Sequence, residues 1–257
     1  MYEEKRLITY YDLDMLGRVK LSALLRMVHV AADANTTALG ASFKVMTSHS
    51  LTFILQRFAI RMLRMPQYGE TVTLRTWPDC VVRGTFSRKS DMYDESGKKI
   101  MECASLWIAF DYAARKILRP AALPIEIPNI GAQGVDLQAK KVLLPSAGEL
   151  PSSSAPADVA THTEFSRHTH TVRYADTDTN RHMNNSIYGD VIENALFPTM
   201  ANVEAAQNAL PWREVQINYL AEARLGDEID VVAWASSANR TVAGTVNGRT
   251  SFVASVC

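Results

Sequence analysis

Hydrophobic and polar positions form two similar series along the chain, each with a helical segment followed by strand-like segments. In residues 21–32, apolar side chains recur at intervals of three and four positions, which predicts a helix with one apolar face. The same spacing predicts a helix over residues 185–196, with Asn185 or Ser186 placed to cap its amino end. Strand-like runs follow the helices, at 52–63, 70–77, 81–92 and 99–111, and again at 213–221, 227–235, 240–246 and 249–256.

This order of elements predicts an antiparallel sheet wrapped around one helix in each series. A short strand ending at an Asp-x-Asp sequence comes before each helix, at residues 12–14 and 176–178. Asn247-Gly248, between two β-prone segments, predicts a tight hairpin. We expect an α+β protein in which the two sheets are joined into one continuous sheet.

The two series are similar in sequence. With an offset of 164, residues 10–14 align with residues 174–178, and both segments have the pattern Tyr-x-Asp-x-Asp. With an offset of 157, three further pairs match: Gly69 with Gly226, Glu70 with Asp227, and Trp77 with Trp234. Their shared order indicates an internal duplication.

A proline-rich stretch separates the two copies. Six of the ten prolines fall between residues 119 and 160, where extended or irregular chain is favoured over helix or central strand. We therefore predict an N-terminal domain over 1–118, a linker over 119–162 and a C-terminal domain over 163–257.

Composition excludes several classes of protein. Apolar residues make up 47% and charged residues 21%, which is typical of a folded globular chain. The net charge is zero, so a general nucleic-acid binder is not expected. Charges interrupt every apolar run, so no segment is long enough for a membrane-spanning helix. The first residues are too charged for a secretory signal. The three cysteines do not have the spacing of a zinc site or a disulfide framework. We expect a cytoplasmic protein without a membrane span.

The densest polar cluster lies at residues 173–185. Its Asp-x-Asp-x-Asn opening is similar to a calcium loop, but the sixth position is Arg181 rather than glycine and the twelfth is Ile187 rather than glutamate. His168 and His170 lack a third metal ligand of suitable spacing, so we predict no metal and no cofactor. Asp14 and Asp176 are interpreted as turn and cap residues.

The pattern Asp178-x-Asn180-x-His182-x-Asn184-Asn185 resembles the D-x-N-x-H-x-N-N signature of acyl-acyl-carrier-protein thioesterases, the double hot-dog enzymes of plant and bacterial fatty-acid release. The segment 217–223, which contains Glu222, resembles the part of that family that contributes a catalytic glutamate. The resemblance extends over nearly the whole chain, including the degenerate first copy.

The resemblance implies a tandem hot-dog fold and hydrolysis of fatty acyl-acyl-carrier-protein (acyl-ACP) to free fatty acid and carrier protein. It also implies a catalytic network of Asp178, Asn180, His182 and Glu222, with acyl carrier protein as the partner. Thioester hydrolysis needs a water nucleophile, a proton acceptor and donors aimed at the developing oxyanion, and these residue types supply them. Either Glu222 or Asp178 could be the base, and a homodimer is compatible with this organisation.

Two departures from the family narrow the mechanism. Plant members have a cysteine directly after the glutamate, but here that residue is Ala223, so direct attack by water is favoured over a cysteine acyl-enzyme. In the first copy, Leu16, Arg18 and Met65 stand where Asn180, His182 and Glu222 stand in the second. We therefore predict one active site per chain.

Two other functions stay open from the sequence. One is an acyl-CoA thioesterase on the same fold, and the other is a non-catalytic module that binds acyl thioesters. If the substrate is acyl-ACP, docking of the acidic carrier protein is expected to use local basic residues, since the whole chain is neutral. The candidates are Arg88-Lys89, Lys98-Lys99 and Arg57 with Arg61 and Arg64, with Lys140-Lys141 as a rival patch.

Overall fold

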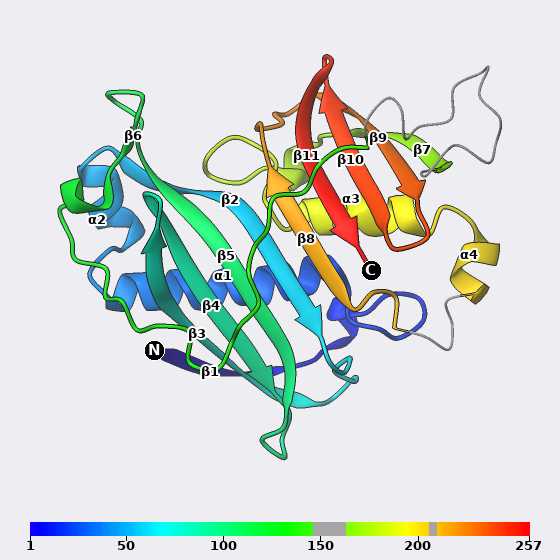
Figure 1. Cartoon of the computed structure of the whole chain (residues 1–257), viewed down its shortest axis with the longest axis horizontal. Coiled ribbons are helices and arrows are strands. Elements are labelled where there is room, and N and C mark those ends of the chain that lie inside the picture. The colour runs from blue at the N-terminus through cyan, green and yellow to red at the C-terminus, as the bar shows by residue number, and fades with distance from the viewer. Residues whose placement is uncertain (146–162, 206–209) are drawn as a thin grey trace. The chain divides into compact units, whose positions relative to one another are not determined.

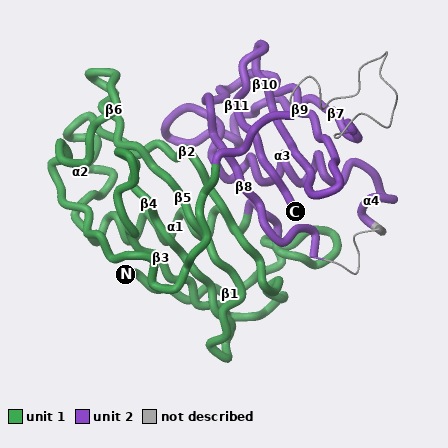
Figure 2. The backbone as a smooth tube through the Cα atoms, in the orientation of Figure 1, with its two compact units in different colours: residues 1–19, 23–140 green, residues 20–22, 141–257 purple. Residues whose placement is uncertain are grey.

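The computed structural model describes residues 1–145, 163–205 and 210–257, and the chain forms two compact units (Figure 2). Unit 1 consists of residues 1–19 and 23–140, and unit 2 consists of residues 20–22 and 141–257. The prolines at 151 and 156, and the rest of the predicted linker from 146 to 162, lie outside the described residues.

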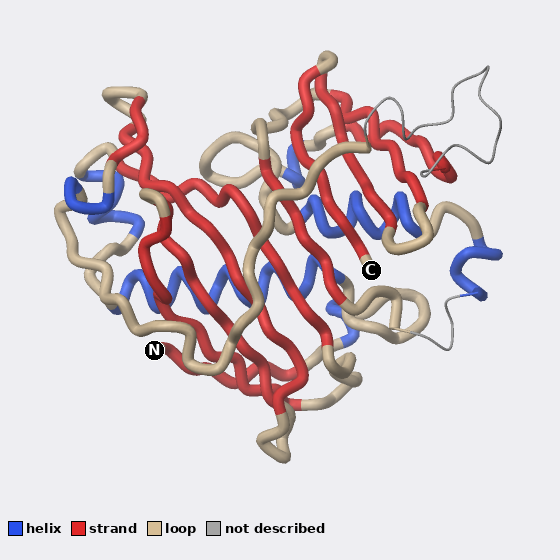
Figure 3. Tube along the Cα trace, viewed as in Figure 1, coloured by secondary structure: helices blue, strands red, loops and turns tan. Residues whose placement is uncertain are grey.

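Unit 1 contains an antiparallel sheet with the strand order β1-β3-β4-β5-β2, to which β6 adds beside β5 (Figure 1). Helix α1 (Leu21–Ala38) lies along one face of this sheet, as Figure 3 shows. Its residues Leu24, Leu25 and Val28 are buried. The other elements are β1 (Tyr2–Leu7), a 3-10 turn (Tyr10–Asp12), α2 (Phe43–Ser48), β2 (Leu51–Met62), β3 (Thr71–Val82), β4 (Thr85–Tyr93), β5 (Lys99–Asp111), β6 (Lys116–Leu118) and a second 3-10 turn (Pro120–Ala122).

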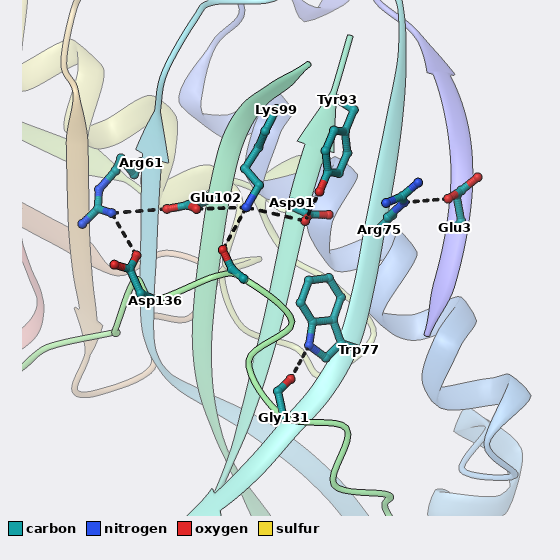
Figure 4. A network of polar contacts seen from close by, with 11 residues as sticks. Glu3, Arg61, Arg75, Trp77, Asp91, Tyr93, Lys99, Glu102, Gly131 and Asp136 are labelled. Atoms are coloured by element: carbon teal, nitrogen blue, oxygen red, sulfur yellow. Dashed lines mark hydrogen bonds and ion pairs between the residues drawn. The ribbon is translucent and has the colours of Figure 1, made fainter. Parts of the chain in front are cut away.

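The opposite face of the unit 1 sheet is covered by residues 128–140, which we call the strap. The indole of Trp77 donates to the carbonyl oxygen of Gly131 at 2.8 Å, and the side chains of Val135 and Leu137 pack on Ala59 and Trp77 (Figure 4). Both faces of this sheet are therefore covered, so polar side chains in its central strands become buried.

Unit 2 has the strand order β8-β11-β10-β9-β7, again fully antiparallel. Helix α3 (Ile187–Leu196) packs against β7, β9 and β10. A Cβ on Gly189 of this helix would lie 2.6 Å from the backbone nitrogen of Ser22, so only glycine fits there. The remaining elements are β7 (Thr163–Thr171), a 3-10 turn (Tyr174–Asp176), α4 (Met200–Ala205), β8 (Glu214–Tyr219), β9 (Glu228–Ala235), β10 (Arg240–Val246) and β11 (Arg249–Val256).

The predicted fold class is confirmed: the protein is α+β, with a tandem hot-dog architecture in which each antiparallel sheet accompanies one long helix. The hairpin predicted at Asn247-Gly248 joins β10 to β11, and both residues have positive φ (49° and 77°), as a type I′ turn requires. Within the described residues, we find no helix with the length and apolar character needed to cross a membrane.

The duplication is repeated in the backbone hydrogen bonds. In unit 1, Ile8 N–H donates to Glu70 C=O at 2.9 Å, and in unit 2 Val172 N–H donates to Asp227 C=O at the same distance. These residues are paired by the offsets that align the two copies. The carbonyl of Ile8 in turn accepts from Gly69, and that of Val172 accepts from Gly226. The two copies therefore share their local connections as well as their order of elements.

The prediction that Arg88-Lys89 docks a carrier protein is wrong, because both side chains are buried. They alternate on β4, a central strand, so Arg88 faces α1 and Lys89 faces the strap. Arg88 donates to Asn35 at 2.8 Å and to Thr36 at 3.1 Å, both on α1, and burial lowers its pKa to about 10. Lys89 donates to the carbonyl oxygen of Leu137.

Other predicted docking residues take part in ion pairs within unit 1 (Figure 4). Arg61 lies 3.2 Å from Glu102, and Lys99 lies 3.1 Å from the same carboxylate. Arg64 pairs with Glu70 and Asp94. These cations are therefore less available to an external acidic partner than the sequence suggests.

Candidate active site

The predicted site residues Asp178, Asn180 and His182 lie in one tight turn before α3. A bridge between Thr177 and Met183 closes the turn. Asp178 N–H donates to His182 C=O at 3.1 Å, and the Asp178 carboxylate accepts from Asn180 N–H at 2.8 Å. Asn180 is exposed and His182 is half-buried, so the turn presents an amide and an imidazole toward solvent.

Asn184 connects this turn to the start of α3. Its amide nitrogen donates to Asp178 Oδ2 at 3.3 Å. Its amide oxygen accepts from the Ser186 backbone at 2.9 Å and from the Ser186 hydroxyl at 2.8 Å. Ser186, one of the two predicted capping residues, is the N-cap of α3, but its side chain makes no capping hydrogen bond and is held by Asn184 instead.

A backbone hydrogen bond brings Glu222 to the turn. Met183 N–H donates to Ala223 C=O at 2.7 Å. His182 precedes Met183 and Glu222 precedes Ala223, so this bond brings two residues that are distant in sequence close together. Glu222 is exposed, and its carboxylate accepts from Arg224 Nε at 3.1 Å. In the part of the chain that the structure describes, no hydrogen bond joins the side chains of His182 and Glu222 directly.

Ser251 on β11 holds the Glu222 segment, and sequence reasoning missed it. Its carbonyl accepts from Leu220 N–H at 2.8 Å and from Ala221 N–H at 3.0 Å, and its hydroxyl donates to Ala221 C=O at 2.8 Å. The Tyr188 hydroxyl lies 3.2 Å from the Ser251 hydroxyl, and burial raises the pKa of Tyr188. The sequence around Ser251 has no recognisable motif, so only the pairing of β11 in the folded structure reveals that Ser251 lies next to the Glu222 segment.

The first copy contains the same turn with different chemistry. Asp14 N–H donates to Arg18 C=O at 2.7 Å, as Asp178 does to His182. Here, however, Arg18 forms a 2.8 Å ion pair with the Asp14 carboxylate, which also accepts from two backbone N–H groups. Asp14 is therefore a turn residue, as predicted. Asp176 is confirmed as a cap residue, since it accepts from Arg173 N–H at 2.8 Å.

The surroundings of Cys80, Cys103 and His168 do not favour further chemistry outside the turn. Burial raises the pKa of Cys103, and burial with Asp79 raises that of Cys80. Ala223, at the position of the plant cysteine, is fully buried. Across the described ranges, no group of three His, Cys, Asp or Glu side chains could hold a metal ion. Desolvation, with His170 nearby, lowers the pKa of His168.

Comparison with known families gives two matches along the chain. Residues 1–122 match the family model of the acyl-ACP thioesterase N-terminal domain, and residues 159–248 match that of the acyl-ACP thioesterase C-terminal domain. Comparison with curated protein sequences found no match.

Two solved structures show the same fold over nearly the whole chain. An acyl-ACP thioesterase from Bacteroides thetaiotaomicron VPI-5482 is similar with a TM-score of 0.76 and 23% identity, covering 99% of this chain and 96% of that one. The 12:0-ACP thioesterase from Umbellularia californica is similar with a TM-score of 0.77 and 16% identity, covering 99% of this chain and 95% of that one.

Proposed function

Because the chain belongs to the acyl-ACP thioesterase family, it hydrolyses the thioester of fatty acyl-ACP, and we propose that it does so with four side chains, Asp178, Asn180, His182 and Glu222. The observation that supports this set is the backbone bond between Met183 and Ala223, which joins the turn to the Glu222 segment. Family membership defines the reaction, and this bond supports placing the two distant segments in one network.

The surroundings of the two carboxylates indicate a different role for each. The Asp178 carboxylate already accepts from Asn180 and Asn184, so it positions the turn. Glu222 is exposed and has one charged partner, Arg224, so its carboxylate is open to a water molecule. We assign Glu222 as the group that accepts the water proton.

In the reaction, the water oxygen bonds to the thioester carbonyl carbon as its proton passes to Glu222. The carbonyl oxygen becomes an oxyanion, which accepts hydrogen bonds from His182 and Asn180, and the positive end of α3 adds to this stabilisation. The carbon–sulfur bond then breaks, the carbonyl reforms, and the leaving thiolate receives the proton. No cysteine takes part in these steps.

The test is hydrolysis of acyl-ACP by His182→Ala and Glu222→Gln, each expected to reduce kcat at least about a hundredfold. Matched controls are His168→Ala and Glu164→Gln, a histidine and a glutamate of β7 in the same unit. Near-normal turnover of a folded His182 or Glu222 variant would remove that residue from the proposed network. A series of acyl-ACP and acyl-CoA substrates of varied chain length would define the preferred substrate.

We also propose that the protein acts in the cytoplasm and forms a homodimer. Support for the location comes from the three cysteines, which are all free thiols, as is usual in a reducing compartment. Cell fractionation tests the location, and sedimentation tests the homodimer.

A further inference from the structure

Arg181 differs from the other residues of the catalytic turn because its backbone is in the left-handed region, with φ of 64°. This region disfavours residues with a Cβ, and glycine is the usual choice there. The equivalent residue of the first copy is Gly17, with φ of 74°. In unit 1 a glycine forms this turn without backbone strain. In unit 2 an arginine takes the same conformation, which is strained for a residue with a Cβ.

The guanidinium of Arg181 has no anionic partner in the part of the chain that the structure describes, unlike two comparable arginines of the chain. Arg181 is exposed, and among the described residues its side chain makes no hydrogen bond or ion pair. The nearby Arg224 binds Glu222, and in the equivalent turn of unit 1 Arg18 binds Asp14. The turn that carries Asn180 and His182 thus presents an unneutralised cation directly beside the predicted catalytic imidazole.

We propose that Arg181 binds the phosphodiester of the pantetheine arm that carries the acyl group. This inference relies on the proposed function. A guanidinium forms bidentate, charge-assisted hydrogen bonds with phosphate oxygens, which ammonium groups do not match in geometry. The thioester must reach His182, and the arm leads from the thioester out to the carrier in solvent. The phosphate lies at the far end of this arm from the thioester, so the long and exposed Arg181 side chain meets it by extending away from His182.

The phosphate could belong to a carrier protein or to CoA, so the experiment compares four thioesters of the same acyl group. Acyl-pantetheine and acyl-phosphopantetheine differ only by the phosphate, and acyl-CoA and acyl-ACP carry that phosphate in two contexts. In Arg181→Ala and Arg181→Gly, we expect KM to rise about tenfold for the three phosphate-bearing substrates. Kinetics with acyl-pantetheine should not change.

Arg181→Gly removes the charge and relieves the strained backbone, so its Tm should equal or exceed that of the wild type. Arg181→Lys should recover part of the lost affinity. Arg240→Ala is the matched control. Arg240 is also an exposed arginine of unit 2, but it begins β10, at the end of this strand that is remote from the hairpin to β11.

Three results would overturn the proposal. A KM increase confined to acyl-ACP would place Arg181 against the acidic surface of the carrier protein. Slower hydrolysis of acyl-pantetheine would place its action at the reacting carbonyl, and unchanged kinetics with every substrate would exclude any role in binding. Hydrolysis of acyl-ACP by the wild type, and its loss in His182→Ala and Glu222→Gln, tests the proposed function separately, so the two failures are distinguishable.

Discussion

At the scale of single residues, His29 is a buried titratable group outside the candidate site. Its ring packs edge-on against Phe58 and Trp107, with centroids 5.7 and 5.8 Å away, and its Nε2 atom is buried without a hydrogen-bond partner among the described residues. Burial lowers the pKa of His29 from 6.5 to about 4. The folded protein therefore keeps this imidazole neutral at pH values where the unfolded chain binds a proton.

This difference predicts a loss of stability in acid. Above pH 6.5 both states hold neutral His29, and as pH falls from 6.5 to about 4 only the unfolded state gains the proton. The expected loss over that window is at most about 3 kcal/mol. Urea unfolding between pH 4 and 7 measures it, and His29→Phe should show a shallower pH dependence than the wild type. Identical pH profiles would mean that His29 binds its proton equally well in the folded and unfolded states.

The cysteines give a second prediction at this scale. Cys103 is buried with a raised pKa, Cys80 also has a raised pKa, and Cys257 is the exposed last residue. Thiolates are the reactive form of cysteine, so these surroundings do not favour a nucleophile. We expect Cys80→Ser, Cys103→Ser and Cys257→Ser to keep most of the acyl-ACP hydrolysis. A folded variant without activity would revive a cysteine mechanism.

At the scale of elements, β11 holds, through Ser251, the segment that leads to Glu222. The equivalent backbone acceptor in unit 1 is Ile100, which binds Leu63 and Arg64 as Ser251 binds Leu220 and Ala221. The hydroxyl is thus present only in the second copy, which we propose to be the catalytic one. Because it fixes Ala221, its loss should let Glu222 move.

We therefore expect Ser251→Ala to lower kcat about tenfold with little change in KM, since a small displacement of a catalytic group slows the chemical step. Ser251→Thr, which keeps the hydroxyl, should restore much of the rate. Ser255→Ala on the same strand is the control. A rise in KM alone would indicate that Ser251 affects substrate binding instead.

The packing of α3 gives another prediction for an element. A Cβ at Gly189 would lie 2.6 Å from the nitrogen and 2.8 Å from the Cα of Ser22, and backbone atoms cannot rotate away. Gly189→Ala should therefore destabilise the protein by about 1–3 kcal/mol, despite the higher helix propensity of alanine. Asn194→Ala, at an exposed position of α3, should be neutral or stabilising. Unfolding by urea compares the two, and a stabilised Gly189→Ala would show that the helix can shift.

The apolar period of residues 21–32 predicted only the first part of α1, which continues to Ala38, and β3 continues to Val82 beyond the predicted 70–77. Sequence periodicity predicted most of the other long strands closely. For example, 249–256 was predicted as a strand and β11 spans Arg249–Val256. The short helices α2 and α4 and the three-residue β6 were missed, because so few positions give no clear period. Arg88 and Lys89 looked like surface residues because their cover, α1 and the strap, is remote in sequence. Ser251 was missed for the same reason, while the residues of the Asp178 turn are local and were found.

At the scale of the whole molecule, duplication has produced two copies of one fold that differ in the polar side chains at equivalent positions. The second copy has Asn180, His182 and Glu222, and the first has Leu16, Arg18 and Met65 at the aligned positions. Both oxygens of the Asp14 carboxylate also have partners, since Oδ1 accepts from two backbone N–H groups and Oδ2 binds the Arg18 guanidinium. The chain is therefore expected to contain one active site rather than two.

This expectation can be tested by counting sites and by separating the two turns. A non-hydrolysable thioether analogue of the substrate should bind in calorimetry with one molecule per chain. Arg18→Ala should leave kcat unchanged and lower only stability, because its ion pair with Asp14 supports a turn that takes no part in the chemistry. His182→Ala, the equivalent change in the second copy, should abolish turnover. Two analogue molecules per chain, or a loss of kcat in a folded Arg18→Ala protein, would show that the first copy keeps a catalytic role, since a purely structural turn cannot slow the reaction without unfolding.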